Sequence, residues 1–379
     1  MPNKMKIAVL TRRYGYNYGS SLQAYAMRLM LEGLGHKVTV LNYDEFSQHP
    51  TWKIKPTLRN IVVPILCFLG KLGLNNNIIY NAKIESEQKI KFRIFDRNNI
   101  CPTKTRLYSS HQLKNAINGM DACICGSDQI WNPLIFDKHF FLDFCDKGEV
   151  RKIAYAPSFG VSKILNNKDD IKKYLSDFNH ISVREKQGQT IIKNLIGSIF
   201  PVVLDPTLMI RADVWKKLMQ IPNVKLPKRY IACCFLGHNY IPQEIISSIL
   251  KQLDCEIVNI TTFRTTNDIK GIQLDNLSPL EFIYAIDKAS YVLTDSFHAT
   301  VFSILFHTSF YSFCKHKKSD ENNENSRLIS LLSLFNLESR YVDDNDMEMK
   351  LEKINFEECD KKLDILRTYS YDFINKALM

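Results

Sequence analysis

The sequence lacks the long apolar segments and the cysteine spacings that mark several protein classes. No run reaches the roughly 18 uninterrupted apolar residues that a membrane-spanning helix needs. The first residues, Met-Pro-Asn-Lys-Met-Lys, lead directly into a short apolar strand rather than into the apolar core of a secretory signal. The ten cysteines include no Cys-x-x-Cys pair, and several lie in strand-like apolar runs, as buried reduced thiols do. We therefore expect a cytoplasmic protein.

General catalytic motifs are missing as well. The chain has no G-x-G-x-x-G fingerprint, no Walker loop, no H-E-x-x-H and no G-x-S-x-G. Its nine histidines are scattered without the spacing of metal ligands, so we expect no metal site. With 379 residues, 45% hydrophobic positions and 24% charged positions, the chain has the composition of an ordinary globular protein with two or three domains.

Positive charge is unevenly distributed along the chain. The formal net charge is +10, and residues 51–106 alone hold eleven basic against three acidic residues. This insertion contains an apolar run, residues 61–74, that is too short to span a bilayer. A buried helix is the favoured interpretation of the run, although the flanking cations would also suit an anionic membrane surface. No helix-turn-helix, zinc-finger or RNP pattern accompanies the charge, so we expect no nucleic-acid partner.

Strand-like runs and helical periodicities alternate along the chain. Residues 5–10, 22–34 and 38–43 follow the order strand, helix, strand, which makes a βαβ unit. After the insertion, further strands are predicted at 121–125, 152–156, 181–183 and 201–204, with a helix at 185–196. A second set has strands at 230–235, 256–260, 291–294 and 309–313, with helices at 242–253, 278–289 and 297–306.

This alternation predicts an α/β protein with two facing Rossmann-like domains. Residues 221–229, with two prolines and three basic side chains, form the best linker. We therefore expect an N-terminal domain at 1–221, which includes the insertion at about 51–106, and a C-terminal domain at 230–355. Residues 356–379 are predicted to form a closing helix. Sheets joined in this way bind ligands in the cleft between the carboxyl ends of their strands.

The first polar cluster follows the first predicted strand, in residues 11–20. Gly19 and Ser20 would allow a tight turn and would offer N–H groups at the start of the next helix. A capped turn would explain the glycines equally well. The tyrosines of this segment would suit stacking on sugar rings; they are Tyr14, Tyr16 and Tyr18.

The second cluster, residues 125–132, is more polar than a turn requires. Asp128 is a candidate base or hydroxyl-binding group, and Trp131 is a candidate wall of a sugar site. The alternative is a buried polar network that ties loops together.

Two further clusters place charge at strand ends. Arg184 follows a strand directly and would bind a carboxylate or phosphate, unless it pairs with Glu185. His298 lies beside Asp295 and Ser296 at the start of a predicted helix, where the helix dipole favours anions and an imidazole can transfer protons.

Taken in order, these segments resemble the polysaccharide pyruvyl transferase family. The resemblance rests on N-x-G-S-x-L-Q-A-Y from Asn17, G-S-D-Q-I-W from Gly126, A-Y-A-P-S-F-G from Ala154, I-S-V-R-E from Ile181, L-D-P-T from Leu204 and T-D-S-F-H-A-T from Thr294. It implies two facing domains of the GT-B type, the N-terminal one on the acceptor side and the C-terminal one on the donor side. It also implies transfer of the enolpyruvyl unit of phosphoenolpyruvate onto two hydroxyls of one sugar, in cell-surface polysaccharide biosynthesis. The products would be a pyruvate ketal and phosphate, with no cofactor.

The resemblance and the residue types together assign candidate roles. His298 is the expected acid, with Asp128 or Asp295 as the base. Donor binding is expected from Arg184, Ser296, His298 and Arg327. Acceptor binding is expected from Tyr14, Asn17, Tyr18, Gly19, Gln129, Trp131 and Ser158. Many family members have an arginine where this chain has Ser296, which leaves one phosphate contact in question.

Two other functions fit the same residues. A GT-B glycosyltransferase would hold the diphosphate of a nucleotide sugar at the helix end near His298. A non-catalytic glycan-binding subunit would use the acceptor side alone. For a pyruvyl transferase, the charge and apolar run of residues 51–106 favour a sugar acceptor on a polyprenyl carrier, with peripheral contact at the inner face of the cell membrane.

Overall fold

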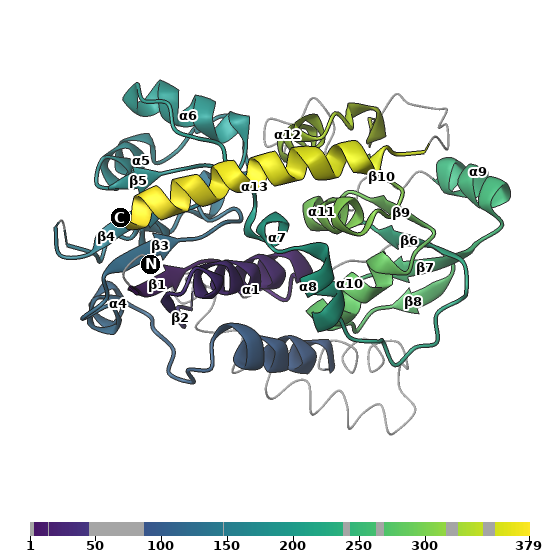
Figure 1. Ribbon diagram of the computed structural model, residues 1–379, viewed down its shortest axis with the longest axis horizontal. Helices are drawn as coiled ribbons and strands as arrows, with labels where there is room; N and C mark the ends of the chain where they lie inside the picture. The colour runs from purple at the N-terminus through teal and green to yellow at the C-terminus, as the bar shows by residue number, and fades with distance from the viewer. Residues whose placement is uncertain are drawn as a thin grey trace.

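The chain folds into two α/β units that lie side by side, each around its own parallel sheet (Figure 1). The computed structural model describes residues 4–13, 15–44, 87–146, 148–237, 243–262, 269–315, 325–343 and 353–379. Two parallel sheets with crossover helices confirm the predicted α/β class with two Rossmann-like domains, the architecture expected of the GT-B type.

The N-terminal unit holds a five-stranded sheet in the order β2-β1-β3-β4-β5. Strand β1 pairs in parallel on both sides, so that Ile7 lies opposite Val38 of β2 and opposite Ala122 of β3. Burial on both faces explains the apolar composition of these strands. Their bounds are Lys6–Leu10 (β1), Lys37–Val40 (β2), Ala122–Cys125 (β3), Arg151–Ala154 (β4) and His180–Ile181 (β5).

The helices of the N-terminal unit pack around its sheet. The first, α1 (Tyr18–Gly33), begins earlier than its apolar periodicity predicts because Asn17 caps it, accepting a hydrogen bond from the Ser20 N–H at 3.1 Å. Helical residues 87–95 run into a π-helical turn, Asp96–Ile100. The remaining helices of the unit are α4 (Ser110–Ala116), α5 (Lys168–Leu175), α6 (Lys186–Ile196), α7 (Pro206–Met209) and α8 (Ala212–Leu218).

The C-terminal unit holds a six-stranded parallel sheet in the order β11-β10-β9-β6-β7-β8. Its strands are β6 (Tyr230–Cys234), β7 (Glu256–Ile260), β8 (Ile272–Leu274), β9 (Tyr291–Thr294), β10 (Phe310–Phe313) and β11 (Tyr341–Val342). Its helices are α9 (Gln243–Leu253), α10 (Pro279–Asp287), α11 (Phe297–Phe306) and α12 (Ser326–Leu334). The edge strands β8 and β11 are too short to have been predicted from apolar patterning. The strand predicted at 201–204 is wrong, because Val202 forms only an isolated bridge with Val183.

The last helix, α13 (Phe356–Leu378), has the predicted bounds and crosses both units (Figure 1). Near its start, Asp360 Oδ1 lies 3.0 Å from Nε2 of His307 in the C-terminal unit. Farther along, Ser370 Oγ accepts a hydrogen bond at 3.0 Å from the Leu204 N–H of the N-terminal unit. The helix therefore ties together the two halves of the molecule.

The two units share a packed interface. Tyr18, at the start of α1, stacks on Phe282 of α10 with ring centroids 4.5 Å apart. Trp215 of α8 meets Phe302 of α11 edge to face at 5.3 Å. Burying an aromatic side chain of this size contributes roughly 1.5–3 kcal/mol, so these contacts hold the units closed over the carboxyl ends of both sheets.

Several expectations fall on parts of the chain that the structure does not describe. Tyr14 and the apolar run at 61–74 lie outside the described residues. Within the described ranges, no helix is long and apolar enough to cross a membrane, and no group of histidine, cysteine and carboxylate side chains could hold a metal ion. The cysteines at the described positions are free thiols, mostly buried.

Candidate functional site

Three ionisable side chains meet where the carboxyl ends of the two sheets face each other. Arg184 follows β5, Asp205 is the N-cap of α7, and His298 lies in the first turn of α11. Asp205 Oδ2 is 3.0 Å from Arg184 Nη1 and 3.6 Å from His298 Nε2. We call these three residues the Asp205 cluster. It joins a guanidinium from the N-terminal unit and an imidazole from the C-terminal unit at a single carboxylate oxygen.

Asp205 is fully removed from solvent but well supplied with donors. Ser127 Oγ donates to Oδ2 at 2.8 Å, and the N–H and hydroxyl of Thr207 donate to Oδ1 at 3.0 and 2.6 Å. Burial raises the pKa of this carboxyl, but His298, Arg184 and Thr207 outweigh burial and hold the pKa well below its usual range. No role was predicted for Asp205 from the sequence, although it lies in the L-D-P-T segment, directly after a predicted strand.

Arg184 is buried, with only part of its hydrogen-bonding capacity used. Its guanidinium carbon lies 4.3 Å from the centroid of the Phe297 ring. Its Nε is 3.5 Å from Glu185 Oε2. Burial lowers the pKa of Arg184, but Asp205, Glu185 and Asp128 outweigh burial and raise it. Neither Nε nor Nη2 has a hydrogen-bond partner within the described ranges. These two donors are the kind of group that an anionic ligand would use.

His298 is positioned by its helix and by a glycine of the opposite unit. Ser296 caps α11, its hydroxyl accepting from the Ala299 N–H at 3.4 Å, which fixes His298 in the first turn. Gly19 of α1 lies against the imidazole so closely that a Cβ on Gly19 would fall 2.0 Å from His298 Nδ1. Position 19 therefore requires a glycine because the two units pack closely there, and not only because a glycine allows a tight turn.

Asp128 lies beside the cluster in an unusual backbone conformation, with φ of 75°. Its carboxylate accepts from the Ser20 hydroxyl and from the Gln129 N–H. Burial raises the pKa of Asp128, but Arg184, His298 and Arg12 outweigh burial and lower it. Asp128 is therefore ionised near neutral pH and electrostatically coupled to Arg184 and His298.

The other predicted donor-side residues are placed differently. Both carboxylate oxygens of Asp295 accept from backbone N–H groups at 2.6 Å, those of Leu236 and Gly237, and burial raises the pKa of Asp295 overall. Its contacts hold the loop after β6. Arg327 is half-buried in the first turn of α12.

The predicted acceptor-side residues divide into interface, core and surface positions. Tyr18 is buried between the units, its hydroxyl donating to the Thr261 carbonyl at 3.1 Å. Trp131 is fully buried, stacked on Phe141, with its indole N–H donating to the Phe140 carbonyl at 3.2 Å. Trp131 thus packs the core of the N-terminal unit in this structure and does not form an open wall.

The remaining three acceptor candidates lie close to the strand ends. Ser158 is buried and donates to Glu185 Oε1 at 2.7 Å, next to the Asp205 cluster. Gln129 is partly exposed, and its side chain packs against Gly160. Asn17 is exposed and serves as the cap of α1.

Charge limits what the cluster can bind. Arg184 and His298 face three carboxylates, those of Asp128, Glu185 and Asp205. An anion that contacted both Arg184 and His298 would have to take the position of Asp205 Oδ2 between them.

Comparisons with known proteins agree with the motifs. The sequence profile of the family described as polysaccharide pyruvyl transferase matches residues 17–313. No protein of curated function matches the chain in sequence. Among solved structures, a UDP-GlcNAc 2-epimerase from Neisseria meningitidis, bound to UDP-GlcNAc, is 10% identical with a TM-score of 0.45, covering 98% of this chain and 94% of that chain. The glycosyltransferase SnogD from Streptomyces nogalater is 10% identical with a TM-score of 0.42, covering 99% of this chain and 95% of that chain. Similarity at this level carries no argument about activity.

Proposed function

The chain belongs to the polysaccharide pyruvyl transferase family, and we propose that it transfers the enolpyruvyl unit of phosphoenolpyruvate onto two hydroxyls of a sugar in cell-surface polysaccharide biosynthesis. The observation that carries the proposal is the Asp205 cluster, in which a guanidinium and an imidazole from opposite units approach one carboxylate oxygen at 3.0 and 3.6 Å. A carboxylate between a guanidinium and an imidazole has the geometry that a small anion would adopt there.

The chemistry needs an acid, fixed positive charge and a base. The first sugar hydroxyl adds through its oxygen to the carbon that bears the phosphate and gives up its proton to the base, while the methylene carbon of the enol takes up a proton from the acid. The carbon–oxygen bond to phosphate then breaks, phosphate leaves with the electron pair, and the second hydroxyl closes the ketal as it loses its proton. His298 is the proposed proton donor, and Arg184 would hold the carboxylate or phosphate of the donor.

Asp128 is the proposed partner of the attacking hydroxyl. It is ionised because its pKa is lowered, and it lies in the N-terminal unit, on the proposed acceptor side. Asp295 is less suited to this role because two backbone N–H groups already occupy its oxygens. At position 296, the serine supplies a helix cap in place of the arginine of many family members, so Arg184 would carry more of the donor's charge.

Mass spectrometry of the reaction tests the proposal. The full chain is incubated with phosphoenolpyruvate and lipid-linked sugar intermediates extracted from cell membranes. We expect one intermediate to gain the mass of one pyruvyl ketal while phosphate is released. The variant Arg184→Ala should abolish the gain, whereas Arg211→Ala, at an exposed position outside the cluster, should leave it intact.

Ligand-dependent thermal stability separates this function from the alternatives. A ligand of the native state raises the melting temperature by mass action, so phosphoenolpyruvate should stabilise the chain. Stabilisation by nucleotide sugars without any stabilisation by phosphoenolpyruvate would support a nucleotide-sugar glycosyltransferase. Glycan binding that survives in Arg184→Ala, without transfer from any donor, would support a binding subunit.

A further inference from the structure

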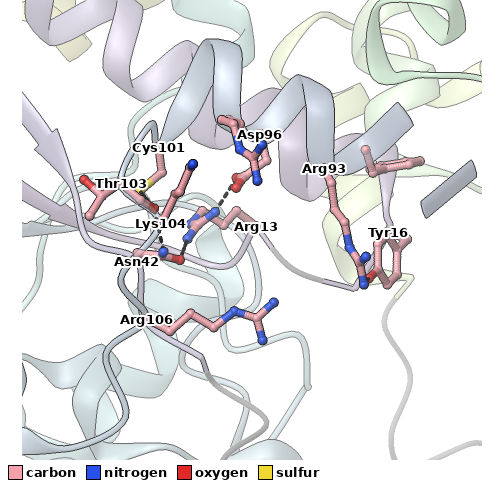
Figure 2. Close-up of a pocket in the computed structure, with 11 residues that line it drawn as sticks. Arg13, Tyr16, Asn42, Arg93, Asp96, Cys101, Thr103, Lys104 and Arg106 are labelled. Carbon is pink, nitrogen blue, oxygen red and sulfur yellow. Dashed lines mark hydrogen bonds and ion pairs between the residues drawn. The ribbon is translucent and has the colours of Figure 1, made fainter. Parts of the chain in front are cut away.

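A cavity of about 220 Å³ lies in the N-terminal unit beside the carboxyl ends of β1 and β2, apart from the Asp205 cluster. Five basic side chains line it, and we call it the basic pocket; they are Arg13, Arg93, Arg97, Lys104 and Arg106. Figure 2 shows the side chains of Arg93, Lys104 and Arg106 arranged around Arg13. Asp96 is the acidic residue among those that line the pocket in the described part of the chain.

Two of the five cations are balanced by carboxylates. Arg13 is buried at the base of the pocket and donates to Asp96 and Asn42 (Figure 2). Arg106 Nη1 lies 3.0 Å from Asp44 Oδ2. Because both are paired with carboxylates, Arg13 and Arg106 line the wall of the pocket but contribute little surplus positive charge.

Three cations remain in excess. Arg93 donates to the Tyr16 hydroxyl at 3.4 Å and forms no ion pair within the described ranges of the chain. Arg97 and Lys104 are exposed at the rim and form no ion pair with any residue that the structure describes. Three like charges around one cavity repel one another unless an anion lies between them, so the pocket is suited to a ligand that carries more than one negative charge.

Residues 11–20 connect the basic pocket to the Asp205 cluster. Arg13 and Tyr16 line the pocket, whereas Gly19 contacts His298. Three residues of chain span at most about 11 Å, so the backbone at Tyr16 lies within that distance of Gly19. The neighbour of Arg13, Arg12, donates from Nη1 to the Gln129 carbonyl at 3.4 Å, beside Asp128. A sugar near Asp128 would therefore have its anomeric substituent within reach of the pocket.

We propose that the basic pocket binds the diphosphate ester that carries the acceptor sugar. The proposal rests on the proposed function, because it assumes that the sugar reacts at the Asp205 cluster. Two linked phosphates provide two charges and several acceptor oxygens, which match three surplus cations better than a single carboxylate does. The aromatic rings of Tyr16 and Phe92, whose centroids are 6.0 Å apart, provide an apolar side to the same cavity. A polyprenyl diphosphate and a nucleoside diphosphate share this chemistry.

Calorimetric titration of the full chain with inorganic pyrophosphate tests the pocket without any transfer reaction. The double variant Arg97→Gln/Lys104→Gln should weaken binding by at least about tenfold, because two charged contacts are lost and each costs roughly threefold to tenfold. The matched control Lys225→Gln/Lys228→Gln removes the same charge from exposed positions between α8 and β6 and should leave binding unchanged. Equal loss in both double variants, or no loss in either, would overturn the proposal.

Further titrations identify the source of the diphosphate and keep the two proposals separate. Tighter binding of farnesyl diphosphate than of pyrophosphate supports a lipid-linked acceptor, and tighter binding of UDP supports a nucleotide-linked one. The variant Arg184→Ala should bind pyrophosphate as the unaltered chain does. If phosphoenolpyruvate displaces pyrophosphate from Arg184→Ala at equal concentration, the pocket is a donor site and the proposal is wrong. Pocket-dependent pyrophosphate binding without any pyruvyl transfer would reject the proposed function but not the pocket.

Discussion

In the Asp205 cluster, a guanidinium and an imidazole approach a carboxylate that has no contact with solvent. In the basic pocket, by contrast, Arg97 and Lys104 extend into solvent and form no ion pair in the described part of the chain. Charges in the first region are desolvated, so each depends on the exact position of its partner. The exposed charges in the second region are screened by water and salt, so the attraction of an anion depends mainly on how many cations surround it. Single substitutions should therefore have large effects in the Asp205 cluster and small effects in the pocket.

The largest effect is expected for His298→Gln. Glutamine keeps a polar side chain but cannot deliver a proton, so kcat/KM for phosphate release from phosphoenolpyruvate should fall by roughly 100-fold to 10,000-fold. The control is His307→Gln at the exposed end of the same helix, where the imidazole pairs with Asp360. Equal activity of the two variants would show that the imidazole of His298 transfers no proton.

Asp205→Asn tests whether the buried charge stabilises the fold. Removing one partner from a buried, hydrogen-bonded charge group costs roughly 3–5 kcal/mol at neutral pH. The pKa of Asp205 is lower in the folded than in the unfolded chain, so its stabilising contribution is present above the unfolded value of about 3.9 and is lost as the pH falls further.

Urea unfolding at pH 7 and at a pH well below the unfolded value of about 3.9 measures this contribution. The free energy of unfolding of the unaltered chain should drop on acidification, and the drop should be smaller in Asp205→Asn. The variant Asp169→Asn, at an exposed position in the first turn of α5, should retain the full drop. An undiminished drop in Asp205→Asn would mean that other carboxyls account for the pH dependence.

Gly19→Ala tests the contact between the units. The added Cβ would fall 2.0 Å from His298 Nδ1, so the units or the imidazole must shift, at a cost of roughly 1–3 kcal/mol. Transfer activity should fall together with the stability of the variant. In the same helix, Gly33 has no neighbouring atom within 4 Å of the position that a Cβ would occupy, and Gly33→Ala should stabilise by about 0.5–1 kcal/mol. Thermal melting of both variants measures the contrast, and similar melting temperatures would contradict the packing argument.

The smallest effect is expected for the ion pair at the rim of the basic pocket. The Arg106 side chain is 41% exposed, although its partner Asp44 is nearly buried. A double-mutant cycle of Arg106→Gln and Asp44→Asn should give a coupling free energy of about 1 kcal/mol or less. A coupling as large as that of a buried pair would remove the contrast between the two regions.

Much of the fold follows from local patterns. The apolar runs that became β1, β3, β7 and β9 were predictable because burial on both faces of a parallel sheet selects continuous apolar segments. The bounds of α13 were predicted as well. β8 and β11 were not predictable, since strands of two or three residues at sheet edges carry no periodicity. The strand expected at 201–204 has the right composition, but it pairs only through Val202.

Polar residues at strand ends located the site, because the carboxyl ends of parallel strands share one edge of a sheet. The sequence determined in this way that Arg184, Asp128 and His298 lie at such ends. It could not show that Asp205 would stand between Arg184 and His298, that Gly19 would pack on the imidazole, or that Trp131 would be core. The burial of Trp131 depends on how the N-terminal unit packs around its own sheet. The contacts of His298 with Asp205 and Gly19 join residues about 90 and about 280 positions apart, and only the packing of one unit against the other brings them together.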